Sequence, residues 1–205
     1  MRISMAKLFA VALLVIIGIG VWIGFMRGNR PPRNLGQLQG LGAISAEDSW
    51  EIKLQKMADQ AVIDAWSHYQ VALDCSTNSI RSMEIILDDR HRSPSFRAFS
   101  DKDKNAEALI AGAYVGEVIR RNHGGYWSTH SEAAGEFSFP LHTLDKNVFP
   151  YMWCLKRLVN GREDNVWHKY LGVALGISNT VLYSVTYRTN LDSSISTNTA
   201  TSTLR

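Results

Sequence analysis

Cysteine and proline are scarce in this chain of 205 residues, and their scarcity excludes several kinds of protein. With two cysteines, the chain cannot be a small domain held together by several disulfides, and it cannot form a zinc site with four cysteine ligands. Five prolines and 15 glycines exclude a collagen and a proline-rich scaffold. Apolar residues make up 45% and charged residues 20%, as in ordinary globular proteins, so the chain is not disordered throughout.

The chain also lacks the short motifs of several enzyme classes. It has no Gly-x-Ser-x-Gly turn for a nucleophilic serine, no Gly-x-x-x-x-Gly-Lys loop for a phosphate and no Gly-x-Gly-x-x-Gly turn for a dinucleotide. Its histidines show no metal-ligand spacing, since no two lie four residues apart on a helix. The motifs therefore predict no catalytic residue, no metal ion and no cofactor. The six histidines are His68, His91, His123, His130, His142 and His168.

An uncharged apolar run covers Leu8–Met26. Its 19 residues would form about 28 Å of helix, close to the ~30 Å hydrocarbon core of a bilayer. A cleaved signal peptide is the alternative, but its apolar core has about 7–15 residues and a small-x-small site follows it, whereas Arg27 and Arg30 follow this run. The run predicts an uncleaved single-pass helix in contact with membrane lipid. Gly20 and Gly24 would let two such helices form a homodimer, although glycine is common in membrane helices generally.

The basic charge of the chain is concentrated beside this run. Five of the 22 Lys and Arg residues precede the first acidic residue, Glu47, and the other 17 are outnumbered by 19 Asp and Glu residues. A nucleic-acid interface needs a basic patch within the folded domain, so we expect no nucleic-acid partner. Basic residues flank the run on both sides and leave its orientation open. Because a long domain can be translocated regardless of its charge, we favour a domain outside the cytoplasm.

Four regions follow from these patterns. Residues 1–33 are the membrane anchor with its basic flanks, and residues 34–45, which include glycines and no charge, are a flexible linker. Residues 46–188 are a globular domain. Residues 189–205 are a disordered polar tail, because eleven of the fifteen residues from 189 to 203 are Ser, Thr or Asn.

Helical patterns dominate the globular domain. Ser45 and Asp48 form a helix start signal, and apolar residues at helical spacing continue this helix through about Val71. Asp101 is expected to cap another helix, which runs to about Asn122. The remaining expected elements are a helix over residues 78–89, a loop over residues 90–100, a buried helix over residues 148–159, which are apolar on nearly all sides, and a helix over residues 163–175.

Aromatic and alternating residues predict strands as well. Residues 126–130 and 136–139 are expected to form a β-hairpin around the turn Ala133–Gly135, and residues 181–187 a final strand. The expected fold class is therefore α+β, a helix-rich globular domain with a small antiparallel sheet, preceded by one transmembrane helix.

Ala108, Gly112 and Gly116 fall on one face of the helix that begins at Asp101. A glycine in a helix interior costs about 0.8–1 kcal/mol relative to alanine, so two glycines on one face need a reason. We expect another backbone segment to approach along this stripe and the helix to lie at the centre of the domain.

A set of short motifs runs through residues 73–175. Ala-Gly-Ala-Tyr-Val-Gly-Glu-Val-Ile-Arg-Arg covers residues 111–121, Gly-Gly-Tyr-Trp covers residues 124–127, and Phe149-Pro150, Lys156-Arg157 and Asn160-Gly161 follow. The arrangement resembles a bacterial domain family of unknown function with the pattern AYxGE…GGxW…FP…KR…NG. This resemblance implies a small α+β domain and supplies no catalytic residue. Some domains of this general kind accompany bacterial toxin systems as immunity proteins. In a bacterium the anchor would lie in the inner membrane, with the domain on the periplasmic side.

Glu117 is the main candidate for chemistry. Arg120 and Arg121 lie three and four residues further on, where they can form ion pairs with Glu117 on the same helix. The carboxylate could also accept a hydrogen bond from the Trp127 indole, or act as a general base with His123. A structural role is the favoured interpretation of Glu117, ahead of partner binding and of catalysis. We name Glu117, Arg120, Arg121 and Trp127 as the candidate partner-binding residues.

The state of the two cysteines is open. Cys75 and Cys154 could pair in an oxidising compartment or remain two thiols. Asp74 would raise the thiol pKa of Cys75, and the apolar neighbours of Cys154 indicate an inert core residue.

Together these patterns favour a membrane-tethered, non-catalytic protein-binding domain. An immunity protein that neutralises a bacterial toxin is the most specific form of this hypothesis. The alternative is a membrane-anchored hydrolase that uses Glu117 and a histidine.

Overall fold

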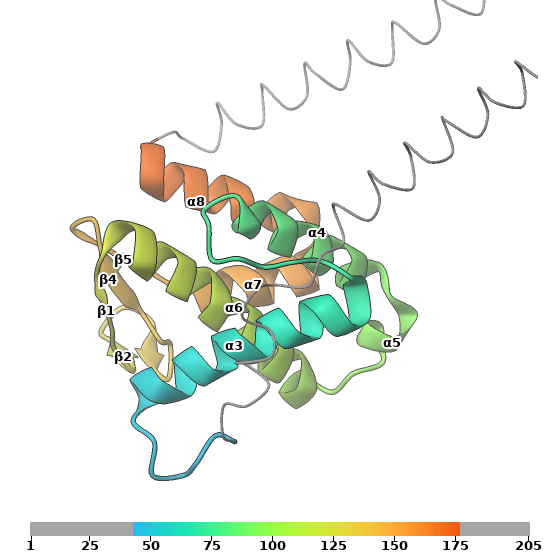
Figure 1. Ribbon diagram of the computed structural model, residues 1–205, viewed down its shortest axis with the longest axis horizontal. Helices are drawn as coiled ribbons and strands as arrows, with labels where there is room; N and C mark the ends of the chain where they lie inside the picture. Colours follow the sequence, from blue (N-terminus) through green and yellow to red (C-terminus); the bar gives the residue numbers. More distant parts are fainter. Residues whose placement is uncertain (1–42, 177–205) are drawn as a thin grey trace, which may run out of the picture.

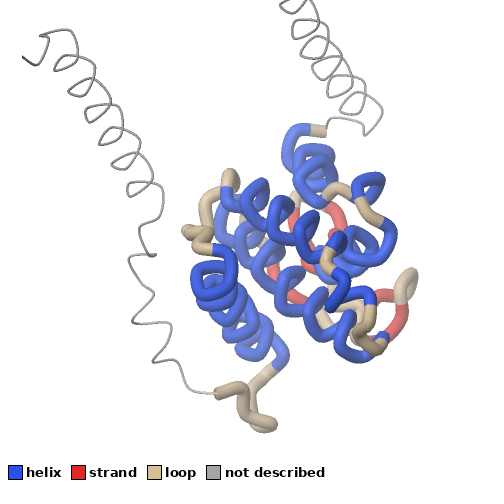
Figure 2. Tube along the Cα trace, turned by 90° about the vertical axis from the view of Figure 1, so that its right-hand side faces the viewer, coloured by secondary structure: helices blue, strands red, loops and turns tan. Residues whose placement is uncertain are grey.

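The computed structural model describes residues 43–176, which fold into a helix-rich α+β domain with small antiparallel sheets (Figure 1). The expected α+β class is confirmed for this part of the chain, and Figure 2 shows how little of it the strands occupy. The helices are α3 (Trp50–Tyr69), α4 (Ser79–Arg92), α5 (Pro94–Arg97), α6 (Asp101–His123), α7 (Pro150–Asn160) and α8 (Val166–Leu175), with a 3-10 helix at Arg162–Asp164.

Helix caps explain why two helices begin at residues other than those predicted. The Ser45 backbone N–H donates to the Asp48 carboxylate at 2.8 Å, so these residues form a turn and not the cap of α3. The cap is Ser49, whose hydroxyl accepts the Ile52 N–H at 3.3 Å. Ser100, not Asp101, caps α6 in the same way.

Two further helix boundaries differ from the sequence prediction. The predicted loop over residues 90–100 contains the end of α4 and the short α5, which has Pro94 at its first position, where the missing N–H costs nothing. The helix predicted over residues 163–175 is divided at Asn165, whose side chain accepts the His168 N–H at 2.8 Å and caps α8.

The strands form two small sheets in place of one predicted hairpin. β1 (Tyr126–Trp127) pairs with β4 (Leu141–Thr143), which also pairs with β5 (Lys146–Val148), while β2 (His130–Ser131) pairs with β3 (Gly135–Glu136). The predicted pairing of residues 126–130 with 136–139 is thus right only at β2 and β3.

Backbone conformation explains the difference in pairing. Phe137 and Phe139 have φ angles of 56° and 46°, which are incompatible with a continuous strand, so β3 ends at Glu136. The strand that pairs with β1 therefore begins only at Leu141. Leu144 and Asp145 also have positive φ and connect β4 to β5 without a glycine, so the sequence carried no turn signal for β5.

Helix α6 packs against both α3 and α7, and the glycine stripe is the reason it can do so. A Cβ atom at Gly112 would overlap the backbone of Tyr151, and a Cβ atom at Gly116 would overlap the Trp127 ring. The predicted close approach of a backbone is confirmed at Gly112. At Gly116 an indole ring takes that place.

Helix α7 is not buried on all sides, so that part of the prediction is wrong. Its buried face consists of Pro150, Cys154, Arg157 and Leu158, whereas Val159 is exposed. Arg157 belongs to the buried face of α7, although polarity alone would place it at the surface. Its side chain is instead fully buried between helices.

Some expected segments lie outside the described residues. These are the apolar run 8–26 with Gly20 and Gly24, most of the linker 34–45, the strand 181–187 and the tail 189–205. Within residues 43–176, every helix is too short or too polar to cross a bilayer.

Candidate functional site

Four residues named from the sequence form one cluster, which we call the Glu117 cluster: Glu117, Arg120, Arg121 and Trp127. The Glu117 carboxylate is fully buried and accepts hydrogen bonds from Arg120 Nε at 2.8 Å and Arg120 Nη2 at 2.9 Å. Trp127 Nε1 donates to Glu117 Oε1 at 2.9 Å, and Arg121 Nε lies 3.5 Å from Glu117 Oε2. The predicted ion pairs and the predicted indole contact are both present.

These contacts make Glu117 a poor proton acceptor. Burial by itself would raise its pKa, but the hydrogen bonds from Arg120 and Trp127 and the charges of Arg120 and Arg121 outweigh burial and hold the pKa below its usual value. A general base works best with a pKa near the operating pH, whereas this carboxylate is shifted away from that range.

His123 does not assist Glu117. Its Nε2 lies 3.0 Å from the hydroxyl oxygen of Tyr170 on α8, and the two rings are 5.8 Å apart. Within residues 43–176, no hydrogen bond joins Glu117 to a histidine. The geometry that a Glu117–histidine hydrolase requires is therefore not assembled in this part of the chain.

The cluster offers a partner little of its surface. Glu117 has no exposed area, and Trp127 is half-buried with its ring against Gly116. Arg121 is the most exposed member, with 45% of its side chain accessible, and its Nη1 also lies 3.1 Å from Cys75 Sγ. In this structure the four residues join α6 to β1 and to the segment after α3.

Both cysteines are free thiols, so the open question of their pairing is answered for this structure. Burial raises the pKa of Cys75, and Asp59 and Asp74 add to this effect. Burial also raises the pKa of Cys154, which is fully enclosed in α7 and confirmed as a core residue. Neither thiol is activated. In the described part of the chain, no three His, Cys, Asp or Glu side chains are grouped to hold a metal ion.

A second buried ion cluster was missed by the sequence analysis. Arg157 is fully buried in α7, its Nε donates to Glu84 Oε1 at 2.6 Å, and its Nη2 donates to Asp88 Oδ1. Glu84 Oε2 in turn accepts the Val166 N–H at 2.8 Å, at the start of α8. We call Arg157, Glu84 and Asp88 the Arg157 cluster. It joins α4, α7 and α8.

A surface of exposed rings lies where the start of α3 meets the strand region, at the left of Figure 1. The Trp50 ring lies 5.8 Å from Phe137 and 4.9 Å from Phe139, and Phe137 lies 6.2 Å from Phe139. Trp50 is 36% exposed and Phe137 is 56% exposed, whereas Phe139 is buried. We call Trp50, Phe137 and Phe139 the aromatic patch.

The aromatic patch has acidic neighbours. Glu47 and Glu51 stand close to Trp50 in the chain, Glu136 precedes Phe137, and Glu132 lies in the turn before it; all four are exposed. We call these four the acidic rim. The nearby Lys56 forms an ion pair with Asp48, with Nζ 2.8 Å from Oδ2. Lys53 Nζ lies 4.9 Å from the centre of the Trp50 ring. Lys53 Nζ also donates to the Ala46 backbone oxygen at 3.1 Å.

No signal in the sequence distinguished these rings from core aromatics. Phe137 and Phe139 lie two residues apart, yet one is exposed and one is buried. Both residues have a positive φ angle, so the alternation of a regular strand does not apply to them, and φ is not visible in a pattern of residue types.

Comparison with known proteins adds no relative, since no family model, no curated protein and no solved structure matches this chain. The function has to be argued from the site itself.

Proposed function

We propose that the chain is a membrane-tethered, non-catalytic protein-binding domain and that the aromatic patch is its contact surface. The observation that carries the proposal is the exposed pair Trp50 and Phe137, supported from below by Phe139. Trp and other aromatic residues supply much of the energy of protein interfaces, and rings held by neighbours lose little entropy on binding. The buried, hydrogen-bonded state of Glu117 supports the non-catalytic part of the proposal.

The acidic rim specifies the chemistry of the partner. Complementary charge around an apolar centre speeds association and selects the partner, so we propose a basic protein surface with an apolar centre. Of the acidic rim, Glu51 also lies within the electrostatic range of Arg120, whose pKa is raised by the Glu117 carboxylate first and by Glu51 to a smaller extent.

An immunity protein that neutralises a toxin is the specific form we propose, following the family resemblance of residues 73–175. The apolar run 8–26 would hold it in a bacterial inner membrane with the domain in the periplasm, and Gly20 and Gly24 would form the helix-pairing face. The gene neighbourhood gives a first check. A toxin gene directly upstream would support this form, and a housekeeping neighbourhood would count against it.

The binding surface can be tested by photo-crosslinking in cells. A photoreactive phenylalanine analogue replaces Phe137 in the full chain, and the matched control places it at Ile85, which is 63% exposed on α4. We expect a discrete crosslinked protein from position 137, lost when Trp50 is changed to Ala and absent from position 85. Equal crosslinking from both positions would contradict the proposed surface.

The membrane tether needs a separate test. The double substitution Leu14→Arg and Ile17→Arg places two charges within the apolar run, each costing about 2.5–3.5 kcal/mol at a helix centre. We expect the chain to move from the membrane pellet to the soluble fraction. The control is Leu35→Arg with Leu38→Arg in the linker, which should leave the chain in the pellet.

A further inference from the structure

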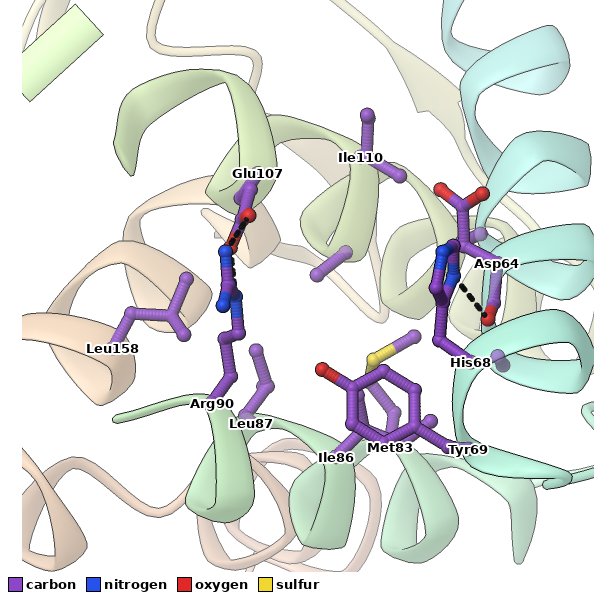
Figure 3. Close-up of a pocket in the computed structure, with 13 residues that line it drawn as sticks. Asp64, His68, Tyr69, Met83, Ile86, Leu87, Arg90, Glu107, Ile110 and Leu158 are labelled. Atoms are coloured by element: carbon purple, nitrogen blue, oxygen red, sulfur yellow. Dashed lines mark hydrogen bonds and ion pairs between the residues drawn. The ribbon is translucent and has the colours of Figure 1, made fainter. Parts of the chain in front are cut away.

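A cavity of about 330 Å³ opens between α3, α4 and α6, with Leu158 of α7 also in its lining (Figure 3). Its floor is apolar and includes Ala61, Met83, Ile86 and Ile110. The small side chain of Ala61 leaves room that a larger residue would fill. The volume lies at the lower end of the range for ligand pockets, which run from about 300 to 1,000 Å³.

Polar groups stand on two opposite sides of this cavity. Figure 3 shows Arg90 and Glu107 on one side and Asp64 and His68 on the other, with the Tyr69 ring between them. This arrangement of a few polar groups around an apolar floor is typical of a small-molecule site. The two sides differ in whether their charged groups already have ion-pair partners.

On the Arg90 side, the guanidinium group already has hydrogen-bond and ion-pair partners. Arg90 Nε and Nη2 donate to the two Glu107 oxygens at 2.8 and 2.5 Å, and Nη1 donates to Ser95 at 3.0 Å. The guanidinium also lies over the rings of Phe96 and Phe99. An anionic ligand would have to displace Glu107 from Arg90, so the cavity is poorly suited to carboxylates and phosphates.

The Asp64 side carries an unneutralised negative charge. Asp64 Oδ1 accepts the Gln60 amide at 2.7 Å, and His68 Nδ1 lies 3.1 Å from the Asp64 backbone oxygen. No cationic side chain pairs with Asp64 in the part of the chain that the structure describes.

The hydroxyl of Tyr69 lies near charges of both signs. Burial raises the pKa of its hydroxyl and Arg90 opposes this, but the carboxylates of Asp89, Glu107 and Asp64 add to the increase. A carboxylate without a paired cation and the face of an aromatic ring both attract a positive charge.

We infer that this cavity binds a small organic cation, an ammonium group carried on an apolar body, with the positive charge on the side of Asp64 and Tyr69 and the apolar body on the floor. The recognising groups are a carboxylate without a paired cation, an aromatic ring and an apolar surface. The inference does not depend on the aromatic patch, which lies at the start of α3.

The test compares three probes of similar shape and different charge. The full chain, labelled with ¹³C at its methionine methyl groups, is placed in phosphatidylcholine nanodiscs at pH 8, where an ordinary histidine is neutral. It is titrated with benzyltrimethylammonium, with the uncharged isostere neopentylbenzene and with phenylacetate. The Met83 methyl resonance reports on the cavity, and Met152 on α7 is the internal control.

The expected result is a saturable shift of the Met83 resonance by benzyltrimethylammonium, with the neutral isostere binding about tenfold more weakly and phenylacetate giving no shift. Asp64→Asn should weaken binding of the cation about tenfold. The matched control Asp145→Asn changes an exposed aspartate in the β4–β5 turn and should leave binding unchanged. Ala61→Leu should abolish binding by filling the floor.

Three outcomes overturn the inference. They are a Met83 resonance that no probe moves, equal binding of the cation and its neutral isostere, and equal binding by Asp64→Asn and Asp145→Asn. Asp64→Asn decides the question if Ala61→Leu does not fold, because it changes one oxygen to nitrogen at the cavity rim. None of these outcomes affects the crosslinking test of the aromatic patch.

Discussion

The two buried ion clusters differ in how far apart their members lie in the chain. In the Glu117 cluster the arginines follow Glu117 by three and four residues, and Trp127 follows by ten. In the Arg157 cluster, Glu84 and Asp88 precede Arg157 by 73 and 69 residues. The ion pairs of the first cluster follow from helix periodicity, and all its members could be named in advance. The second exists only after α4 and α7 have packed together.

The two clusters also differ in what they leave unsatisfied. Arg120 and Arg121 reach solvent, with 27% and 45% of their side chains exposed. Arg157 is fully buried, and its Nη1 finds no hydrogen-bond partner within residues 43–176. A buried charge depends entirely on its partners, so loss of one member should cost more in the Arg157 cluster.

Arg157→Met is expected to have the largest effect. It leaves the Glu84 carboxylate buried with only the Val166 N–H as a donor, so the free energy of unfolding should fall by about 3–4 kcal/mol. Urea denaturation followed by circular dichroism measures this. The control is Lys156→Met on the exposed face of α7, which should change stability by less than about 0.5 kcal/mol. Similar losses for both variants would contradict the distinction between the clusters.

Glu117→Gln should cost less, about 2 kcal/mol at pH 7, because the glutamine oxygen still accepts the indole N–H while the arginines turn to solvent. The pH dependence gives a sharper test. The folded-state pKa of Glu117 is lowered, so its contribution is present above the ordinary value of 4.5 and is lost as the pH falls through the folded value. The difference between wild type and Glu117→Gln should therefore shrink in acid. A difference that stays constant from pH 7 to pH 3 would show that the charge of Glu117 is not the cause.

Trp127→Phe should reduce stability by about 1.5 kcal/mol. The change removes the indole N–H that donates to Glu117, but both bonds from Arg120 remain. The effect should be smaller in a Glu117→Gln background, because a hydrogen bond to a neutral amide is weaker than one to a carboxylate. A double-mutant cycle at pH 7 measures this interaction, and strict additivity of the two losses would count against it.

Arg121→Ala should have the smallest effect, about 0.3 kcal/mol. The side chain is largely exposed, and its Nε lies 3.5 Å from a carboxylate that Arg120 already neutralises. A thermal unfolding midpoint within about 2 °C of wild type is expected. A loss of stability as large as that of Arg157→Met would show that the Glu117 cluster does not contribute less than the Arg157 cluster.

Several residues of the motif pattern in residues 111–161 make contacts between helices and strands. Gly112 and Gly116 allow Tyr151 and Trp127 to approach α6, and Trp127 then donates to Glu117. Arg157 joins α7 to α4. In this structure these residues connect α6 to β1 and α7, and α7 to α4.

Several elements could be predicted because their causes are local. The helical runs in α3, α4 and α6, the glycine stripe and the Glu117–Arg120 pair depend on residues within one or two turns of helix. The β1–β4 pairing could not be predicted, since it depends on positive φ at Phe137 and Phe139, where aromatic residues gave no turn signal. The cavity beside Asp64 was also beyond prediction, because its lining comes from separate helices.

By itself, the sequence determined the α+β class, the central glycine-bearing helix and the arginine partners of Glu117, because helix periodicity acts over a few residues. The tertiary structure alone decided that Arg157 is buried, that Trp50 and Phe137 are exposed, and that an unneutralised carboxylate lies beside an apolar cavity. The reason is physical: the exposure of a side chain and the charge around it depend on atoms that packing brings together from distant parts of the chain.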